Sequence, residues 1–154
     1  MQAARWLQLS GWGALAGALI HVAAIAGGPE WFLYFRAPPQ VVESARAGTW
    51  LAPVSALAIA GAMALCAAYA FSAAGRLPRL PLMRTALATI AAICLLRAVS
   101  TIPIYLYWPH LIDTFEVVAG IVWGVIGLGF AMGLRRDDGG GGRRQAQPMP
   151  PSAA

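Results

Sequence analysis

The chain has 154 residues, of which 59% are hydrophobic and only 11% are charged, and its mean hydropathy is +0.65. Soluble domains carry about 25% charged residues, so this composition excludes an ordinary soluble domain and indicates a single integral membrane domain. The net charge of +5 is the balance of 11 basic residues, all of them arginines, and 6 acidic residues. Most of the arginines lie in short connections and in the C-terminal tail, where they act as topology signals, so no nucleic-acid partner is expected.

Four segments contain enough apolar residues to cross a bilayer, which takes about 20. They are residues 7–28, 50–74, 85–107 and 115–134. The first also carries a small-x-small pattern typical of signal-peptide cleavage, but its apolar run is longer than the usual stretch of about 7–15 residues, which favours a retained helix. The expected fold class is all-α: an integral membrane four-helix bundle formed by residues 1–136.

The connections between these spans contain clear helix breakers. Gly27-Gly28-Pro29 ends the first span, and Pro38-Pro39 suits the start of another helix. Residues 38–49 are therefore expected to form either a helix lying on the membrane surface or an N-terminal extension of the second span. Residues 137–154 contain four consecutive glycines and no apolar period, so they are predicted to form a disordered tail.

Arginine placement predicts the orientation of the spans. One group of arginines precedes the first span, fills the connection between the second and third, or follows the fourth: Arg5, Arg76, Arg79, Arg84, Arg135, Arg136, Arg143 and Arg144. The other two connections carry only Arg36 and Arg46, and they also hold acidic residues. Because positive charge stays on the cytoplasmic side, both termini are expected in the cytoplasm of a bacterial inner (plasma) membrane, with the protein crossing it several times.

Arg97 is the most informative single residue, because it lies inside the third apolar span. A guanidinium keeps its charge in any protein setting, and placing it near a helix centre costs roughly 2.5–3.5 kcal/mol on insertion scales. A partner is therefore expected. If Pro103 kinks the third span or ends it early, Arg97 lies only about two turns below the break. Glu116, about one turn into the fourth span, is then the preferred candidate, and Asp113 and Glu43 are the alternatives.

His21 lies late in the first span, at a depth similar to that of Arg97. A lone histidine in a helix is more often a hydrogen-bonded core residue than a ligand, and His110 is poorly placed to pair with it for haem binding. No spacing supports a zinc site, and Cys66 and Cys94 are interpreted as small apolar core residues. No cofactor, metal or catalytic residue is therefore predicted.

Hydroxyl residues in the spans also lack the sequence context of a nucleophile. No nucleophile elbow, phosphate-binding loop or zinc-protease motif is present. The four hydroxyl residues in the second and third spans are instead expected to bond back to helix carbonyl groups: Ser55, Ser72, Ser100 and Thr101.

Two larger patterns leave alternatives open. Residues 19–48 and 95–120 share an order of polar residue, proline, aromatic patch and acidic residue. This order is consistent with a parallel duplication of a two-helix unit. It is also expected without duplication, because any connection on the outer side requires a helix breaker and aromatic residues at the membrane boundary. Glycines spaced four apart, such as Gly13 with Gly17 and Gly120 with Gly124, allow close helix packing, either within the bundle or across a homodimer.

Several stretches carry a resemblance to known proteins: Gly27-Gly28-Pro29-Glu30-Trp31-Phe32 with Phe35-Arg36-Ala37-Pro38, Ala68-Tyr69-Ala70-Phe71-Ser72-Ala73-Ala74-Gly75, Leu80-Pro81-Leu82 and Leu95-Leu96-Arg97. Together they resemble a group of small four-helix inner-membrane proteins of proteobacteria. Arg36 and Ala98 stand where that pattern has glycine. The resemblance implies the same topology and no particular activity.

Three functions are consistent with these features. The leading hypothesis is a non-enzymatic membrane protein that binds a small ligand, a lipid or a partner protein. Its outward-facing polar pocket is formed around Arg97, His21, Glu43 and Glu116, with Asp113 nearby. The second is a structural or accessory membrane subunit in which Arg97 forms a structural ion pair. The third is an enzyme acting on a lipid-soluble substrate, which requires an acid–base pair or nucleophile in the cavity.

Overall fold

The structure is a computed structural model that describes the backbone of residues 2–111 and 113–145 and the side chains of residues 2–110 and 113–135. Four long helices dominate it: α1 (Gln2–Gly27), α4 (Leu51–Ala73), α5 (Met83–Tyr107) and α6 (Thr114–Gln145). All four, α6 over Thr114–Arg135, are long and apolar enough to cross a membrane. The all-helical fold expected from composition is therefore present in the described part of the chain.

The observed helices differ from the predicted spans mainly at their ends. α1 begins at Gln2 rather than at residue 7, and α6 continues to Gln145 rather than ending at residue 134. No proline occurs between Thr114 and Gln145, so every residue there keeps the amide that a helix requires. The predicted disorder is therefore not seen for residues 137–145, and residues 146–154 lie outside the described residues.

Short helices form the connections between the long ones. α2 (Pro29–Tyr34) follows Gly28, whose positive φ of 70° turns the chain, and both α2 and α3 (Pro39–Arg46) begin with proline. Ser44 fastens α3 to the start of α4, because its Oγ accepts the Ala52 amide hydrogen at 2.9 Å. Of the two alternatives for residues 38–49, the structure has the separate helix. A 3₁₀ turn, η1 (Pro109–Leu111), connects α5 to α6.

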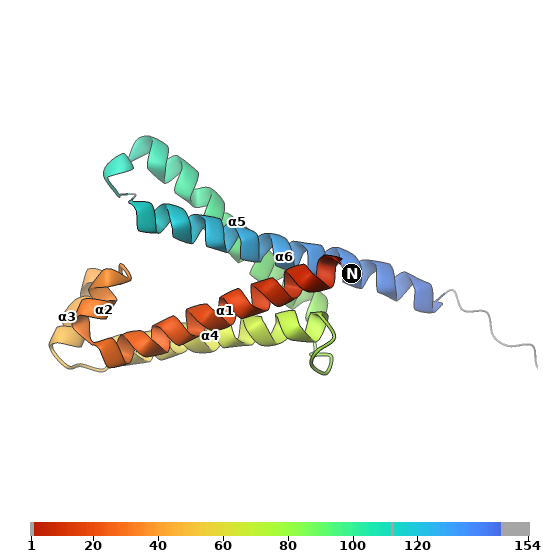
Figure 1. The fold of residues 1–154 in the computed structure, drawn as a ribbon, viewed down its shortest axis with the longest axis horizontal. Coiled ribbons are helices and arrows are strands. Elements are labelled where there is room, and N and C mark those ends of the chain that lie inside the picture. Colours follow the sequence, from red (N-terminus) through yellow and green to blue (C-terminus); the bar gives the residue numbers. More distant parts are fainter. Residues whose placement is uncertain (1, 112, 146–154) are drawn as a thin grey trace, which may run out of the picture.

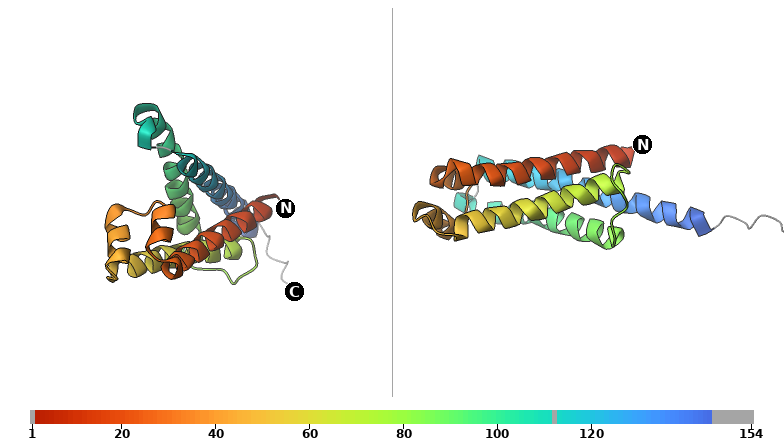
Figure 2. Two further views of the ribbon diagram at one scale, coloured as in Figure 1. Left: turned by 60° about the vertical axis from the view of Figure 1, so that its left-hand side comes forward. Right: turned by 90° about the horizontal axis from the view of Figure 1, so that it is seen from below.

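The long helices form two antiparallel hairpins, α1 with α4 and α5 with α6 (Figure 1). The hairpins meet mainly where α1 packs on α6, near the N-terminus, and they diverge toward the α2, α3 and η1 connections in both Figure 1 and Figure 2. α4 and α5 touch little. The helices therefore form a V of two hairpins.

Close approach of α1 and α6 depends on glycine. A Cβ on Gly129 would lie 2.9 Å from the carbonyl oxygen of Trp6 and would overlap the side chain of Ser10. Ser10 is buried, and its Oγ donates to the carbonyl oxygen of Ile126 at 3.1 Å. Helices in lipid use small residues and such hydrogen bonds because apolar side chains alone give little preference for protein over lipid. This contact joins the two hairpins.

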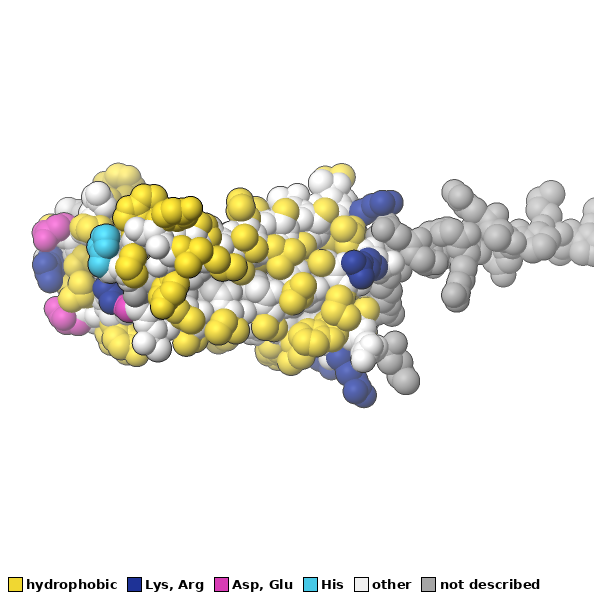
Figure 3. Space-filling view, turned by 90° about the horizontal axis from the view of Figure 1, so that it is seen from above, with side chains coloured by type: hydrophobic (Ala, Val, Ile, Leu, Met, Phe, Trp, Pro, Cys, Tyr) yellow, Lys and Arg dark blue, Asp and Glu magenta, His cyan; other side chains and the backbone are white. Residues whose placement is uncertain are grey.

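Charged side chains divide between the two ends of the molecule. We call the end formed by the N-terminus, the α4–α5 connection and the last turns of the spanning part of α6 the basic end. Its described charged side chains are all arginines: Arg5, Arg76, Arg79, Arg84 and Arg135. The opposite, mixed-charge end carries acidic and basic residues together, and Figure 3 shows both distributions on one face.

Candidate functional site

Arg97 lies on α5, six residues or about 1.7 turns before Pro103. The proline does not end the helix, which runs to Tyr107, but it has no amide hydrogen to donate to the carbonyl oxygen of Val99. The chain therefore stays helical through the region where an early break was one expectation. The unbroken helix therefore fixes the direction in which the Arg97 side chain leaves the backbone.

The guanidinium of Arg97 pairs with the carboxylate of Glu116 at the start of α6. Its Nη2 donates to Glu116 Oε2 at 2.7 Å, and its Nη1 donates to Thr101 Oγ1 at 3.4 Å. The exposed fractions of the two charged side chains are 40% for Arg97 and 24% for Glu116. The short distance and partial burial identify a charge-assisted hydrogen bond between neighbouring spans. The preferred partner of the sequence prediction is thus the one found beside Arg97.

Asp113 positions Glu116 and also connects to the other hairpin. Its Oδ1 accepts the backbone amide hydrogen of Glu116 at 3.0 Å, as an N-cap residue does, and a glutamate in the first turn also suits the positive end of the helix dipole. Its Oδ2 accepts from Nη2 of Arg36, which lies between α2 and α3. Two ion pairs therefore lie side by side at the mixed-charge end. We call Arg36, Asp113, Glu116 and Arg97 the charge cluster.

Two other sequence candidates do not join the charge cluster. His21 Nδ1 lies 2.8 Å from the carbonyl oxygen of Gly17, one turn back in the same helix, so this nitrogen is the donor. Glu43 pairs with Arg46 at 3.4 Å within α3, and its side chain is 73% exposed. The structure therefore does not assemble one pocket from all the predicted polar residues.

Hydroxyl side chains of the spans mostly bond to their own helices, as the sequence predicts. Ser55 Oγ donates to the Ala52 carbonyl at 3.0 Å, and Ser100 Oγ donates to the Arg97 carbonyl at 2.9 Å. Ser72 differs, because its Oγ donates to the Pro78 carbonyl at 2.7 Å. It thus fixes the α4–α5 connection. None of these hydrogen bonds joins a hydroxyl to a base that would activate it.

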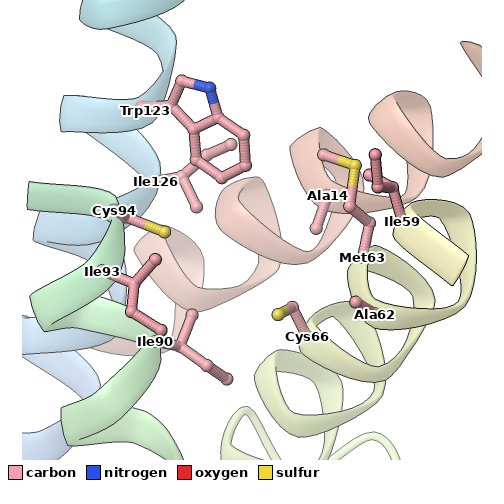
Figure 4. Close-up of a pocket in the computed structure, with 10 residues that line it drawn as sticks. All are labelled: Ala14, Ile59, Ala62, Met63, Cys66, Ile90, Ile93, Cys94, Trp123 and Ile126. Carbon is pink, nitrogen blue, oxygen red and sulfur yellow. The ribbon is translucent and has the colours of Figure 1, made fainter. Parts of the chain in front are cut away.

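A cavity of about 260 Å³ lies between the two hairpins, nearer the middle of the helices. Its lining is apolar and comes from all four long helices: Ala14, Ile59, Ala62, Met63, Cys66, Ile90, Ile93, Cys94, Trp123 and Ile126. Figure 4 shows the α5 and α6 side chains facing those of α1 and α4 across it. Both cysteines are free thiols on its wall. Among the described residues, no three His, Cys, Asp or Glu side chains are grouped closely enough to hold a metal ion.

Two features of this region were not predicted from the sequence. The sequence analysis assigned no partner to Arg36, although it pairs with Asp113, 77 residues away. The cavity was also missed, although helical spacing places Ile90, Ile93 and Arg97 on one side of α5. That spacing was the available signal. Arg97 itself is not among the residues that line the cavity.

By length and composition of its helices, the chain has the fold of a multi-pass helical membrane protein. No protein-family model, curated protein or solved structure matches it.

Proposed function

We propose that the chain is an accessory or structural protein of the bacterial inner membrane, with both termini in the cytoplasm, in which the charge cluster fixes the arrangement of the two hairpins. The observation that carries this proposal is the 2.7 Å contact between Arg97 Nη2 and Glu116 Oε2. The carboxylate of Glu116 compensates the positive charge of the Arg97 guanidinium within the protein, so no anionic ligand is required to stabilise that charge.

The second ion pair supports the same role. Arg36 belongs to the connection within the α1–α4 hairpin, whereas Asp113 begins α6 in the other hairpin. The hairpins diverge toward this end (Figure 1), and the buried apolar cluster there, around Phe32 and Val42, belongs to the α1–α4 hairpin. A charge pair between the hairpins therefore limits how far they separate. The segregation of arginines at the basic end supports a cytoplasmic location for that end.

A second candidate function is binding of a small anion at Arg97 from the outer side of the membrane. The observation that favours it is the 40% exposure of the Arg97 side chain. A guanidinium has five N–H donors, and only two contacts, to Glu116 and Thr101, involve its nitrogens in the described part of the chain. The remaining donors are those that an outer anionic ligand would use.

A charge exchange separates these functions. The test variant is Arg97→Glu combined with Glu116→Arg, compared with each single reversal, and the measurement is the fraction of detergent-extracted protein that elutes as a monodisperse folded species. A structural pair predicts that both single reversals lose folded protein and that the double reversal regains much of it. An anion site predicts that inorganic phosphate raises the melting temperature of the wild type and not of Arg97→Leu. A double reversal no better than the single ones, together with such a phosphate effect, would reject the structural role.

A further inference from the structure

The cavity between the hairpins opens sideways, toward the region that lipid occupies around a membrane protein. Its deep wall is formed by buried residues, Ala14, Cys94 and Ile126. Its edges are exposed, since Ile59 on α4 and Ile93 on α5 are 46% and 61% accessible. The opening therefore lies between α4 and α5, which touch little.

The depth of the cavity matches the position of acyl-chain ends. Its α4 and α5 residues lie near the middle of the two helices, Leu51–Ala73 and Met83–Tyr107. At about 1.5 Å per residue, ten residues of helix separate Ile93 from the start of α5 by roughly 15 Å. Half of a hydrocarbon core is also about 15 Å thick. A lipid whose headgroup lies at the basic end would therefore place its tail end at the cavity.

The α4–α5 connection supplies a positive site at that end. It contains Arg76 and Arg79 and is followed by Arg84 at the start of α5, and all three side chains are exposed. Two hydrogen bonds to carbonyl oxygens hold the connection against α4, from Ser72 Oγ to Pro78 at 2.7 Å and from the Tyr69 hydroxyl to Pro81 at 3.1 Å. Arginines on a fixed connection lose less freedom on binding than arginines on a loose one.

The basic end keeps a surplus of positive charge even when the charged residues after the fourth span are counted. Eight arginines belong to the N-terminal segment, the α4–α5 connection and the region after the fourth span, and the acidic residues there are Asp137 and Asp138. Basic pockets at the ends of membrane helices bind anionic lipid headgroups through such a surplus. A zwitterionic headgroup offers the same phosphate without net charge, so charge selects between lipids with identical tails.

We propose that the α4–α5 side of this protein is a binding site for one anionic phospholipid. Its phosphate contacts the arginines of the α4–α5 connection, and one of its acyl chains fills the cavity between the hairpins. The site rests on the membrane location of the chain, but it does not depend on the charge cluster, which lies at the opposite end of the molecule.

Trp123 provides a reporter inside the cavity, because it is one of the lining residues (Figure 4). A full-length variant with the other five tryptophans replaced by phenylalanine is reconstituted in phosphatidylcholine nanodiscs. A minority of lipid carrying bromine near the chain terminus, either phosphatidylglycerol or phosphatidylcholine, is then added, since bromine quenches indole fluorescence on contact. The proposal predicts stronger quenching by brominated phosphatidylglycerol at equal mole fraction, and a decrease in this preference as salt is raised.

Matched variants test each half of the site. Replacing Arg76 and Arg79 by glutamine should lower the preference by about fivefold per arginine at low salt, whereas Arg46→Gln at the opposite end should preserve it. Ala62→Phe, which fills the cavity, should remove the selective quenching. Ala64→Phe is its control, because Ala64 is an exposed residue of α4 that does not line the cavity.

Several outcomes would overturn the proposal. Equal quenching by the two lipids, or a preference unchanged by the arginine substitutions, would mean ordinary contact with surrounding lipid. Persistence of selective quenching in Ala62→Phe would mean that no chain enters the cavity. If the tryptophan replacements prevent folding, native mass spectrometry of the wild-type chain measures which lipid remains bound. Retention of one phosphatidylglycerol supports the site, and equal retention of both lipids rejects it. Since all these variants keep the charge cluster, failure here leaves the proposed structural role to its own test.

Discussion

Removing the negative charge of Glu116 should destabilise the protein by about 2 kcal/mol. The estimate follows from the geometry of the pair: exposed ion pairs contribute about 0.2–1 kcal/mol, and breaking a desolvated pair costs about 3–5 kcal/mol. With exposed fractions of 40% for Arg97 and 24% for Glu116, this pair lies between those limits. A hydrogen bond to a charged group contributes about 1.5–3 kcal/mol, which agrees with this intermediate value.

A double-mutant cycle measures the interaction. Glu116→Leu, Arg97→Leu and the double leucine variant are unfolded by titrating sodium dodecyl sulfate into mixed micelles, and helix content is followed by circular dichroism. Each single variant leaves one charge without its partner and should lose about 1–2 kcal/mol, whereas the double variant should lie within about 1 kcal/mol of the wild type. With a loss of about 2 kcal/mol for Glu116→Leu and about 1 kcal/mol for each of the other two variants, the coupling energy should be about 2 kcal/mol.

Glu43→Gln is the control for loss of a carboxylate at the same end of the molecule. Its partner Arg46 lies 3.4 Å away, and both side chains are at least half exposed, so the change should alter stability by less than about 0.5 kcal/mol. The reasoning fails if the Arg97–Glu116 coupling energy is indistinguishable from zero. It also fails if Glu43→Gln is as damaging as Glu116→Leu.

Three further predictions concern packing, topology and the C-terminal segment. Gly129→Ala should destabilise the same micelle unfolding transition by about 1–3 kcal/mol because its Cβ would meet the Trp6 backbone, whereas Gly61→Ala, with open space around it, should be neutral or slightly stabilising. In a chain without native cysteines, Gln40→Cys should react with an impermeant maleimide from outside intact cells and Gly140→Cys only after permeabilisation, and the reverse pattern would contradict the orientation. Deleting residues 139–154, which removes the last turns of α6, should leave the melting temperature of the detergent-solubilised protein nearly unchanged, and a large decrease would show that this segment stabilises the fold.

The sequence predicted the local parts of this architecture well. Four apolar runs predict four helices because a backbone in hydrocarbon must satisfy its own hydrogen bonds, and the observed helices cover those runs. The partner of Arg97 was also predicted, but on the assumption that Pro103 shortens the third span. The pair with Glu116 forms although α5 continues to Tyr107. The end of α6 was predicted less well, because composition alone does not show where a helix without prolines stops.

Long-range contacts were decided only by the tertiary structure. Arg36 with Asp113 and Ser10 with Ile126 join residues 77 and 116 positions apart, and no local periodicity relates them. Apolar side chains surround each spanning helix, so the sequence marks no single stripe as the packing face. The faces that meet are selected by where small residues allow backbones to approach, as Gly129 does against Trp6. Composition and helix breakers thus determined four helices long and apolar enough to cross a membrane, and the end of the molecule at which most of the charged residues lie. The divergence of the hairpins, and with it the cavity between α4 and α5, depends on how helix surfaces fit together in three dimensions.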